Sequence, residues 1–145
     1  MNKYKEMINQ SYRPGKYLGL VKQILRLSRI LHLMARVLPG AYGLRPFLHR
    51  LRGVKIGDKV WIGDDVYLDE DYPEALEIHE GAAIATLCTI IAHTKGCGKI
   101  VIGKQAAIGG GCVIVCSSGQ TLRIGEGAVI SVGTPVTHDI PPYIL

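Results

Sequence analysis

The side chains best suited to chemistry stand in two short stretches of the chain. One stretch is acidic and carries Asp69, Glu70, Asp71, Tyr72 and Glu74. The other, residues 90–98, carries His93. An imidazole gains and loses a proton near physiological pH, which suits general acid–base catalysis, and a carboxylate can accept several hydrogen bonds. A single histidine does not identify a catalytic base, so the elements that position it decide how it is interpreted.

A repeat with a period of six residues surrounds both stretches. Aliphatic residues recur in four sets of three, at Ile56, Ile62 and Leu68, Ile78, Ile84 and Ile90, Ile102, Ile108 and Ile114, and Ile124, Ile130 and Val136. A small residue stands four positions after most of them, and glycine directly follows five. A period of six fits neither an amphipathic helix nor an alternating strand. It predicts triangular coils that stack as parallel strands, with glycine easing the corners.

The spacing of the repeat breaks after every third aliphatic residue. The step is ten residues from Leu68 to Ile78, twelve from Ile90 to Ile102 and ten from Ile114 to Ile124. Insertions therefore leave the coils at one corner of the triangle. The acidic stretch lies in the first insertion and His93 in the second, and loops on a rigid scaffold often carry binding or catalytic residues.

Residues 102–111, 124–130 and 136–142 resemble the hexapeptide-repeat acyltransferases, whose fold is a left-handed parallel β-helix. The resemblance covers roughly residues 53–143. The left hand follows from the resemblance alone, because parallel crossovers are ordinarily right-handed. The family implies an acetyl-CoA-dependent O-acetyltransferase that acts on a sugar or polysaccharide precursor by direct transfer, in a homotrimer.

The resemblance also implies roles for individual residues. His93 matches the family's general base, and Gly110 matches the donor to the thioester carbonyl. Positions that match cofactor contacts are Ala107, Gly110, Val132, Thr137 and His138. Ala107 stands where relatives often have tryptophan, His138 stands where they usually have lysine, and the Gly-Asn-Pro-Ala-like tail is missing after Pro142. These departures leave three alternatives: CoA binds more weakly, other groups of the protein replace the missing contacts, or the chain is a shortened form.

The acidic insertion matches the corner from which relatives bind the acceptor. Asp69 is the nearest equivalent, with Asp71 and Tyr72 beside it. Asp69 either orients His93 or accepts a hydrogen bond from a sugar hydroxyl, and a solvated loop is an equal alternative. His79 occupies a turn position where glycine is common, and we expect it to be structural.

Charge divides the chain of 145 residues into two parts. No acid occurs between Met7 and Gly57, whereas ten lysines and arginines do. From Asp58 onward eleven acids stand against five bases. We therefore predict a basic amphipathic helical segment over residues 1–52, facing something anionic, and the hexapeptide-repeat β-helix domain over residues 53–145.

Residues 16–38 predict an amphipathic helix, with Leu20, Ile24, Leu27, Leu31, Met34 and Leu38 at three- and four-residue steps. A second short helix is predicted over residues 45–52. The longer helix either caps the open edge of the first coil or contacts an anionic membrane surface, and one face can serve each purpose. No transmembrane span, signal peptide or nucleic-acid-binding motif is indicated.

Two other functions remain open. The first is a non-catalytic β-helix used for assembly. The second is a metalloenzyme of the γ-carbonic-anhydrase type, but His79 and His93 lack the paired spacing it needs, so no metal is expected. Cys88 and Cys112 fall at inward positions, and no disulfide is expected. Reduced thiols and a CoA substrate both favour the cytoplasm, with a peripheral membrane contact as the alternative for the front end.

Overall fold

The computed structural model describes residues 18–145, and side chains from Leu27 onward. Positions 16 and 17 of the predicted first helix lie outside this range. The helices are α2 (Leu18–Val37) and α3 (Leu44–Leu51), and a 3-10 turn, η1, covers Pro73–Ala75. The strands are β1 (Lys55–Ile56), β2 (Trp61–Ile62), β3 (Tyr67–Leu68), β4 (Leu76–Ile78), β5 (Ala83–Ile84), β6 (Thr89–Thr94), β7 (Lys99–Ile102), β8 (Ala107–Ile108), β9 (Val113–Ser117), β10 (Thr121–Ile124), β11 (Val129–Ile130) and β12 (Pro135–Val136).

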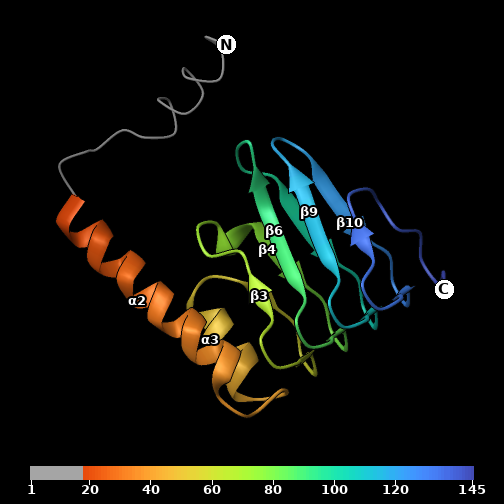
Figure 1. The fold of residues 1–145 in the computed structure, drawn as a ribbon, viewed down its shortest axis with the longest axis horizontal. Helices are drawn as coiled ribbons and strands as arrows, with labels where there is room; N and C mark the ends of the chain where they lie inside the picture. The colour runs from red at the N-terminus through yellow and green to blue at the C-terminus, as the bar shows by residue number, and fades with distance from the viewer. Residues whose placement is uncertain (1–17) are drawn as a thin grey trace, which may run out of the picture.

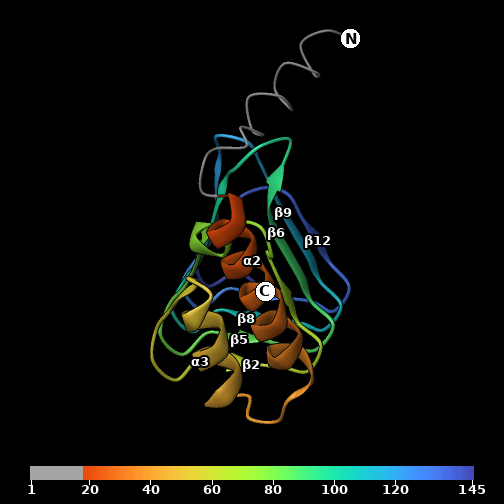
Figure 2. The same cartoon turned by 90° about the vertical axis from the view of Figure 1, so that its left-hand side faces the viewer.

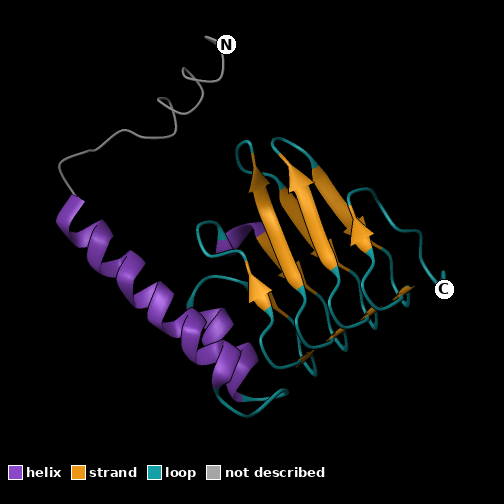
Figure 3. Ribbon diagram, viewed as in Figure 1, coloured by secondary structure: helices purple, strands orange, loops and turns teal. Residues whose placement is uncertain are grey.

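The strands form three parallel sheets, and each coil contributes one strand to each sheet (Figures 1 and 3). Their orders are β1-β4-β7-β10, β2-β5-β8-β11 and β3-β6-β9-β12. The repeat sets the register, because Ile78 pairs with Ile56 on one side and with Ile102 on the other. The predicted β-helix of about four triangular coils, with helices ahead of it, is confirmed.

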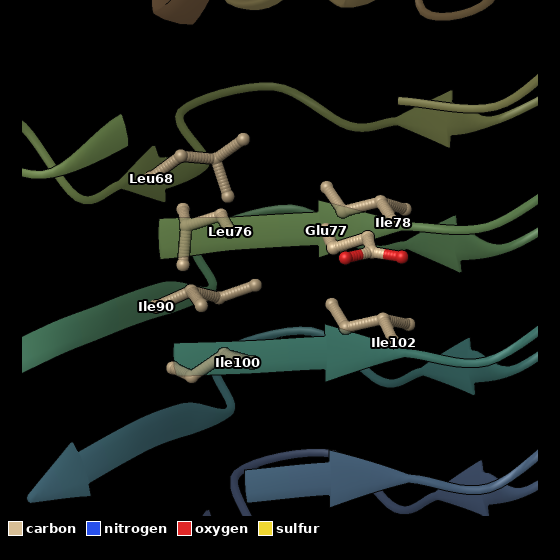
Figure 4. A pocket seen from close by; sticks show the side chains of 7 residues that line it. All are labelled: Leu68, Leu76, Glu77, Ile78, Ile90, Ile100 and Ile102. Carbon is tan, nitrogen blue, oxygen red and sulfur yellow. The ribbon is translucent and has the colours of Figure 1, made fainter. Parts of the chain in front are cut away.

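Stacked aliphatic side chains fill the inside of the coils. Figure 4 shows Leu68, Leu76, Ile90 and Ile100 facing one another between strands, and they leave no space for a water molecule. Cys88 and Cys112 are completely buried in this core, as predicted. Any ligand must therefore bind outside the coils.

The glycine after an aliphatic residue has a different role from the predicted one. A Cβ on Gly103 would lie 2.7 Å from the Glu126 amide nitrogen, and one on Gly109 would lie 2.6 Å from that of Val132. Neither residue has the positive φ that a glycine-dependent turn requires. These glycines let adjacent coils approach closely, and the corner itself does not depend on them.

The helices cover the open end of the first coil (Figures 1 and 2). The Ile62 amide donates to the Ala41 carbonyl and the Asp65 amide to the Arg36 carbonyl, each at 3.0 Å. These bonds occupy edge amides that would otherwise be left unpaired. The capping interpretation of the helix is therefore confirmed.

Three arginines complete the cap, one on each side of the triangle. Arg50 donates to the carbonyls of Ile56 and Gly57 after β1, and Arg45 donates to that of Ile62 in β2. Arg52 donates to the carbonyls of Leu68 and Asp69 at the end of β3. Arg36 and Arg45 also pair with Asp65 and Asp64. Part of the positive charge of the helical segment is thus balanced by acids of the first coil.

The face of α2 that meets the coil differs from the predicted leucine stripe. His32 and Ala35 are buried against the coil, whereas Leu27 and Met34 from the stripe are exposed. Leu31 and Leu38 are half-buried. A small residue at Ala35 allows close approach of the helix to the coil, and this leaves the more apolar side of α2 facing outward.

Candidate active site

The insertions place the acidic stretch and His93 at one corner, as predicted. Asp69 follows β3 directly, and His93 lies near the end of β6, which pairs with β3 through Leu68 and Ile90. Because the two strands are neighbours in the same sheet, the residues that leave them lie side by side. The predicted corner of loops is visible where β6 and β9 run on beyond the shorter strands (Figure 3).

Asp69 is completely buried and accepts four hydrogen bonds. Its Oδ1 accepts the backbone amides of Asp71 and Tyr72 at 3.1 and 3.0 Å. Its Oδ2 accepts the Ala92 amide at 2.7 Å and lies 2.6 Å from Nδ1 of His93. Amides can only donate, so the carboxylate is an acceptor at both oxygens.

This arrangement fixes the state of the His93 ring. Because Asp69 accepts, Nδ1 carries the proton, and in the neutral ring Nε2 holds the free lone pair. The His93 side chain is 29% exposed, so Nε2 can be reached from solvent while Nδ1 is held by a buried group. The site therefore offers one oriented proton acceptor, the chemistry of a general base.

Two further predicted residues surround the exposed side of the ring. Oδ2 of Asp71 lies 3.6 Å from Nε2 of His93, and the Asp71 side chain is 57% exposed. The Tyr72 ring is tilted against the imidazole, with the ring centres 5.6 Å apart. Asp69, Asp71, Tyr72 and His93 thus form one cluster, which we call the acid–histidine cluster.

Arg52 supports this cluster and was missed as a site residue. One of its terminal nitrogens donates to the Asp69 carbonyl at 2.7 Å, and the other lies 2.9 Å from Nδ1 of His49. Burial is the main cause that lowers the pKa of Arg52 from its ordinary value. In the sequence Arg52 is one of ten lysines and arginines between Met7 and Gly57, and no spacing distinguishes it.

The loop after His93 is stacked on the loop of the next coil. The Thr94 hydroxyl donates to the Cys116 carbonyl at 2.6 Å, and the Ser118 amide donates to the Thr94 carbonyl. Within the loop the Gly98 amide donates to the Ala92 carbonyl at 2.6 Å. These bonds hold the end of β6, and with it the backbone of His93, in place.

Gly110 and Val132 lie at a different corner from His93. Gly110 follows β8, and its carbonyl accepts the Gly133 amide beside Val132. The Gly110 amide donates to no residue within the range 18–145. His93 lies beside the C-terminal end of β9, because the next residue, Thr94, pairs with Ser117, whereas Gly110 precedes β9, whose five residues span about 13 Å. A single copy of the chain does not bring them together.

The remaining predicted cofactor contacts divide between these corners. Ala107 lies on the outer side of β8, close to Gly110 in the chain, and is half-buried. Thr137 and His138 follow β12, in the same sheet as β6, and their side chains pair at 2.8 Å between Oγ1 and Nδ1. The predicted cofactor contacts therefore form two groups. One lies beside Gly110, and the other follows β12, in the sheet that holds His93.

His79 lies away from the acid–histidine cluster. It pairs with Glu77 at 2.8 Å, and Glu77 also binds Lys99 at 2.9 Å. Hydrogen bonds from Lys99 and His79 lower the pKa of Glu77 to about 2. An open hollow of about 400 Å³ runs beside these residues and includes Lys55 and Lys104, but not His93.

Within residues 18–145, no three or more His, Cys, Asp or Glu side chains are grouped so that they could hold a metal ion. In the same range, neither helix combines the length and the apolar character that crossing a membrane requires.

The chain is similar to a Bacillus subtilis (strain 168) protein named "Putative acetyltransferase YvoF". The two are 30% identical over 137 residues, which cover 90% of this chain and 73% of the relative. The match is too long for the coils alone, so it extends into the helical segment. No protein-family model and no solved structure matches the chain.

Proposed function

Because the chain belongs to the same family as this Bacillus subtilis acetyltransferase, we propose that it transfers an acetyl group from acetyl-CoA to a hydroxyl of a sugar or polysaccharide precursor. The observation that carries the proposal is the bond between buried Asp69 and Nδ1 of His93, which leaves Nε2 as the proton acceptor. A β-helix used only for assembly would not need an imidazole held in this way.

His93 acts as the general base of the proposed reaction. Nε2 takes the proton of the acceptor hydroxyl while the hydroxyl oxygen forms a bond to the acetyl carbonyl carbon. The carbon–sulfur bond then breaks, and the proton passes from Nε2 to the CoA sulfur. Asp69 accepts backbone amides at both oxygens, so it stays in place as the acceptor for Nδ1, and it stabilises the ring while the ring is positively charged.

Asp71 and Tyr72 position the acceptor in this proposal. The Asp71 carboxylate faces Nε2 at 3.6 Å and is exposed, so it can accept a second hydroxyl of a sugar beside the reacting one. The Tyr72 ring provides an apolar surface next to the imidazole, suited to the face of a sugar ring.

Gly110 supplies the donor for the negative charge that develops on the carbonyl oxygen. Its amide is without an acceptor in residues 18–145, as such a donor should be before substrate binds. Because His93 of the same copy lies beside the far end of β9, the proposal requires Gly110 from a neighbouring copy. We therefore propose a homotrimer with the site between copies, and exposed Val113, Val129 and Val132 provide apolar surface for it.

The thioester part of acetyl-CoA would bind near Ala107 and Gly110, with Val132 beside them and with Thr137 and His138 toward the other end. Small side chains suit close approach at the first corner. At the second, Thr137 and His138 offer a hydroxyl and an imidazole to the cofactor's phosphates. The role of the bound cofactor in this proposal is to supply the activated acetyl group.

The proposal is tested by release of the CoA thiol, measured across a panel of acyl-CoAs and sugar acceptors. We expect acetyl-CoA to be used, and His93→Ala to lower kcat/KM about 10²- to 10⁴-fold without changing the oligomer mass measured by light scattering. His79→Gln is the matched control, a histidine with a carboxylate partner outside the cluster, and should stay within about twofold. Retention of most activity by His93→Ala would reject His93 as the base, and no thiol release with any acceptor would favour an assembly role.

A further inference from the structure

The capping helices present a large apolar surface on the side away from the coils. Its members are more than a third exposed, and they are Leu27, Ile30, Leu33, Met34 and Val37 of α2, Tyr42 of the connection, and Leu44, Phe47 and Leu51 of α3. We call this set the outer helical face. Figures 1 and 2 show both helices at the first-coil end of the molecule, opposite the C-terminus. Exposed apolar side chains gathered on two neighbouring helices are a feature of interaction sites.

The charged residues of the two helices are of one sign. No acidic residue occurs between Met7 and Gly57, so neither helix contributes a carboxylate. Arg36, Arg45 and Arg52 point into the cap, where they bind carboxylates or carbonyls of the first coil. The cap therefore uses these three arginines internally, and they are not what an outside partner would meet.

A second group of bases remains along α2. The sequence of α2 has no acid and has bases at positions 22, 26, 29 and 36. Of these, Arg29 is 65% exposed and keeps a contact of 3.2 Å with Glu70. It directly precedes exposed Ile30 in the helix. An exposed base thus borders the apolar side chains.

We propose that the outer helical face rests on a lipid bilayer that contains anionic head groups. Its apolar side chains would enter the acyl boundary, and exposed bases such as Arg29 would meet the lipid phosphates. A second copy of the chain fits less well, because neither helix has an acid that could pair with the bases of the other copy. A bilayer offers an apolar layer to the exposed apolar side chains and anionic head groups to the bases beside them.

The test is partition of the full chain onto vesicles, measured by sedimentation. We expect binding to vesicles of phosphatidylglycerol mixed with phosphatidylcholine, and at least about tenfold weaker binding to phosphatidylcholine alone or after the salt is raised. Ile30→Glu and Phe47→Glu place a carboxylate on each helix of the face, and each should lower partition about tenfold or more. Leu145→Glu makes the same kind of change at the other end of the molecule, where Leu145 is 96% exposed, and should have no effect beyond about twofold.

Thermal melting of each variant shows whether the fold is kept, which we expect because Ile30 and Phe47 are each more than half exposed. Equal partition of the wild type and both face variants would overturn the proposal. It would also be overturned by light scattering that shows concentration-dependent association lost in Ile30→Glu, with no vesicle binding by the wild type. In that case the face joins copies of the chain.

Discussion

The cap and the acid–histidine cluster use the same side chain in opposite ways. In the cap, His32 packs edge-on against Tyr67 with ring centres 4.8 Å apart, and neither of its nitrogens has a partner in the described chain. Burial, followed by nearby Arg52 and Arg36, lowers the pKa of His32 to about 4. In the cluster, His93 is partly exposed and is held by a buried carboxylate. Environment, and not residue type, makes one ring a packing element and the other a candidate base.

Arg52 joins these two regions. It contacts His49, whose pKa burial lowers to about 3, and it also holds the backbone carbonyl of Asp69. The position of the cap therefore affects the carboxylate that orients His93. Substitutions on either side of Arg52 can separate a structural role from a catalytic one.

The largest expected effect comes from Asp69→Asn. An amide in place of the carboxylate cannot accept from three amides and the imidazole in the same way, so His93 loses its fixed tautomer. We expect kcat/KM to fall at least about 10²-fold, by analogy with the loss of an orienting carboxylate in a catalytic triad. Asp71→Asn, at an exposed carboxylate near the same ring, should cost less than about tenfold. Equal losses in the two variants, measured by thiol release, would contradict an orienting role for Asp69.

Arg52→Met should show that the cap supports the cluster. The change leaves buried carbonyls of Leu68 and Asp69 without their donor, which costs about 1–3 kcal/mol in the free energy of unfolding, measured with denaturant. We also expect about a tenfold loss of kcat/KM, because Asp69 loses a restraint. Arg50→Met removes an exposed arginine from the same first-coil edge and is the control, expected to leave kcat/KM within about twofold. An Arg52→Met chain with unchanged activity would separate the two regions.

The buried histidines of the cap predict a loss of stability in acid. Below about pH 6.5 the unfolded chain protonates His32 and His49, whereas the folded chain resists protonation until about pH 4 and about pH 3. The unfolded state then binds more protons, so the free energy of unfolding falls as the pH falls. The slope should reach about 1.4 kcal/mol per pH unit for each histidine between these limits. His32→Phe should make the dependence shallower, as measured by denaturant unfolding from pH 7.5 to 4.5, and an unchanged slope would contradict the prediction.

The smallest effect is expected for His79→Gln. His79 also has a carboxylate partner, but its side chain is 38% exposed and its partner Glu77 keeps a second bond to Lys99. We expect a change below about 1 kcal/mol in the free energy of unfolding near pH 7. A larger loss would mean that a carboxylate partner alone, without the burial of Asp69, is enough to make a histidine important.

The sequence predicts the coils well because their signal is local and repeated. Each aliphatic residue meets its equivalent in the next coil, so twelve hexads support one another. The same periodicity predicts that the insertions share a corner, and this is why Asp69 and His93 could be assigned to one region before their contact was seen.

The cap was predicted less well because it depends on one arrangement that nothing repeats. Leucines define an apolar stripe on α2, yet Ala35 and His32 make the contact with the coil. The contact of Arg52 with Asp69 depends on where α3 ends relative to β3. Neither the helical period nor the six-residue period of the sequence predicts how these two elements are placed. In the proposed trimer, the place of Gly110 relative to His93 of a neighbouring copy depends on contacts between copies, and the spacing of residues along one chain does not predict these contacts.

The three arginines at the first-coil edge have a consequence for growth of the stack. Identical rungs can in principle be added without limit, since every open strand edge is a template for another strand. Arg45, Arg50 and Arg52 place a guanidinium over one carbonyl position or more on each side of the triangle. A further rung would have to displace three charged groups together, so this end of the molecule resists polymerisation into fibres.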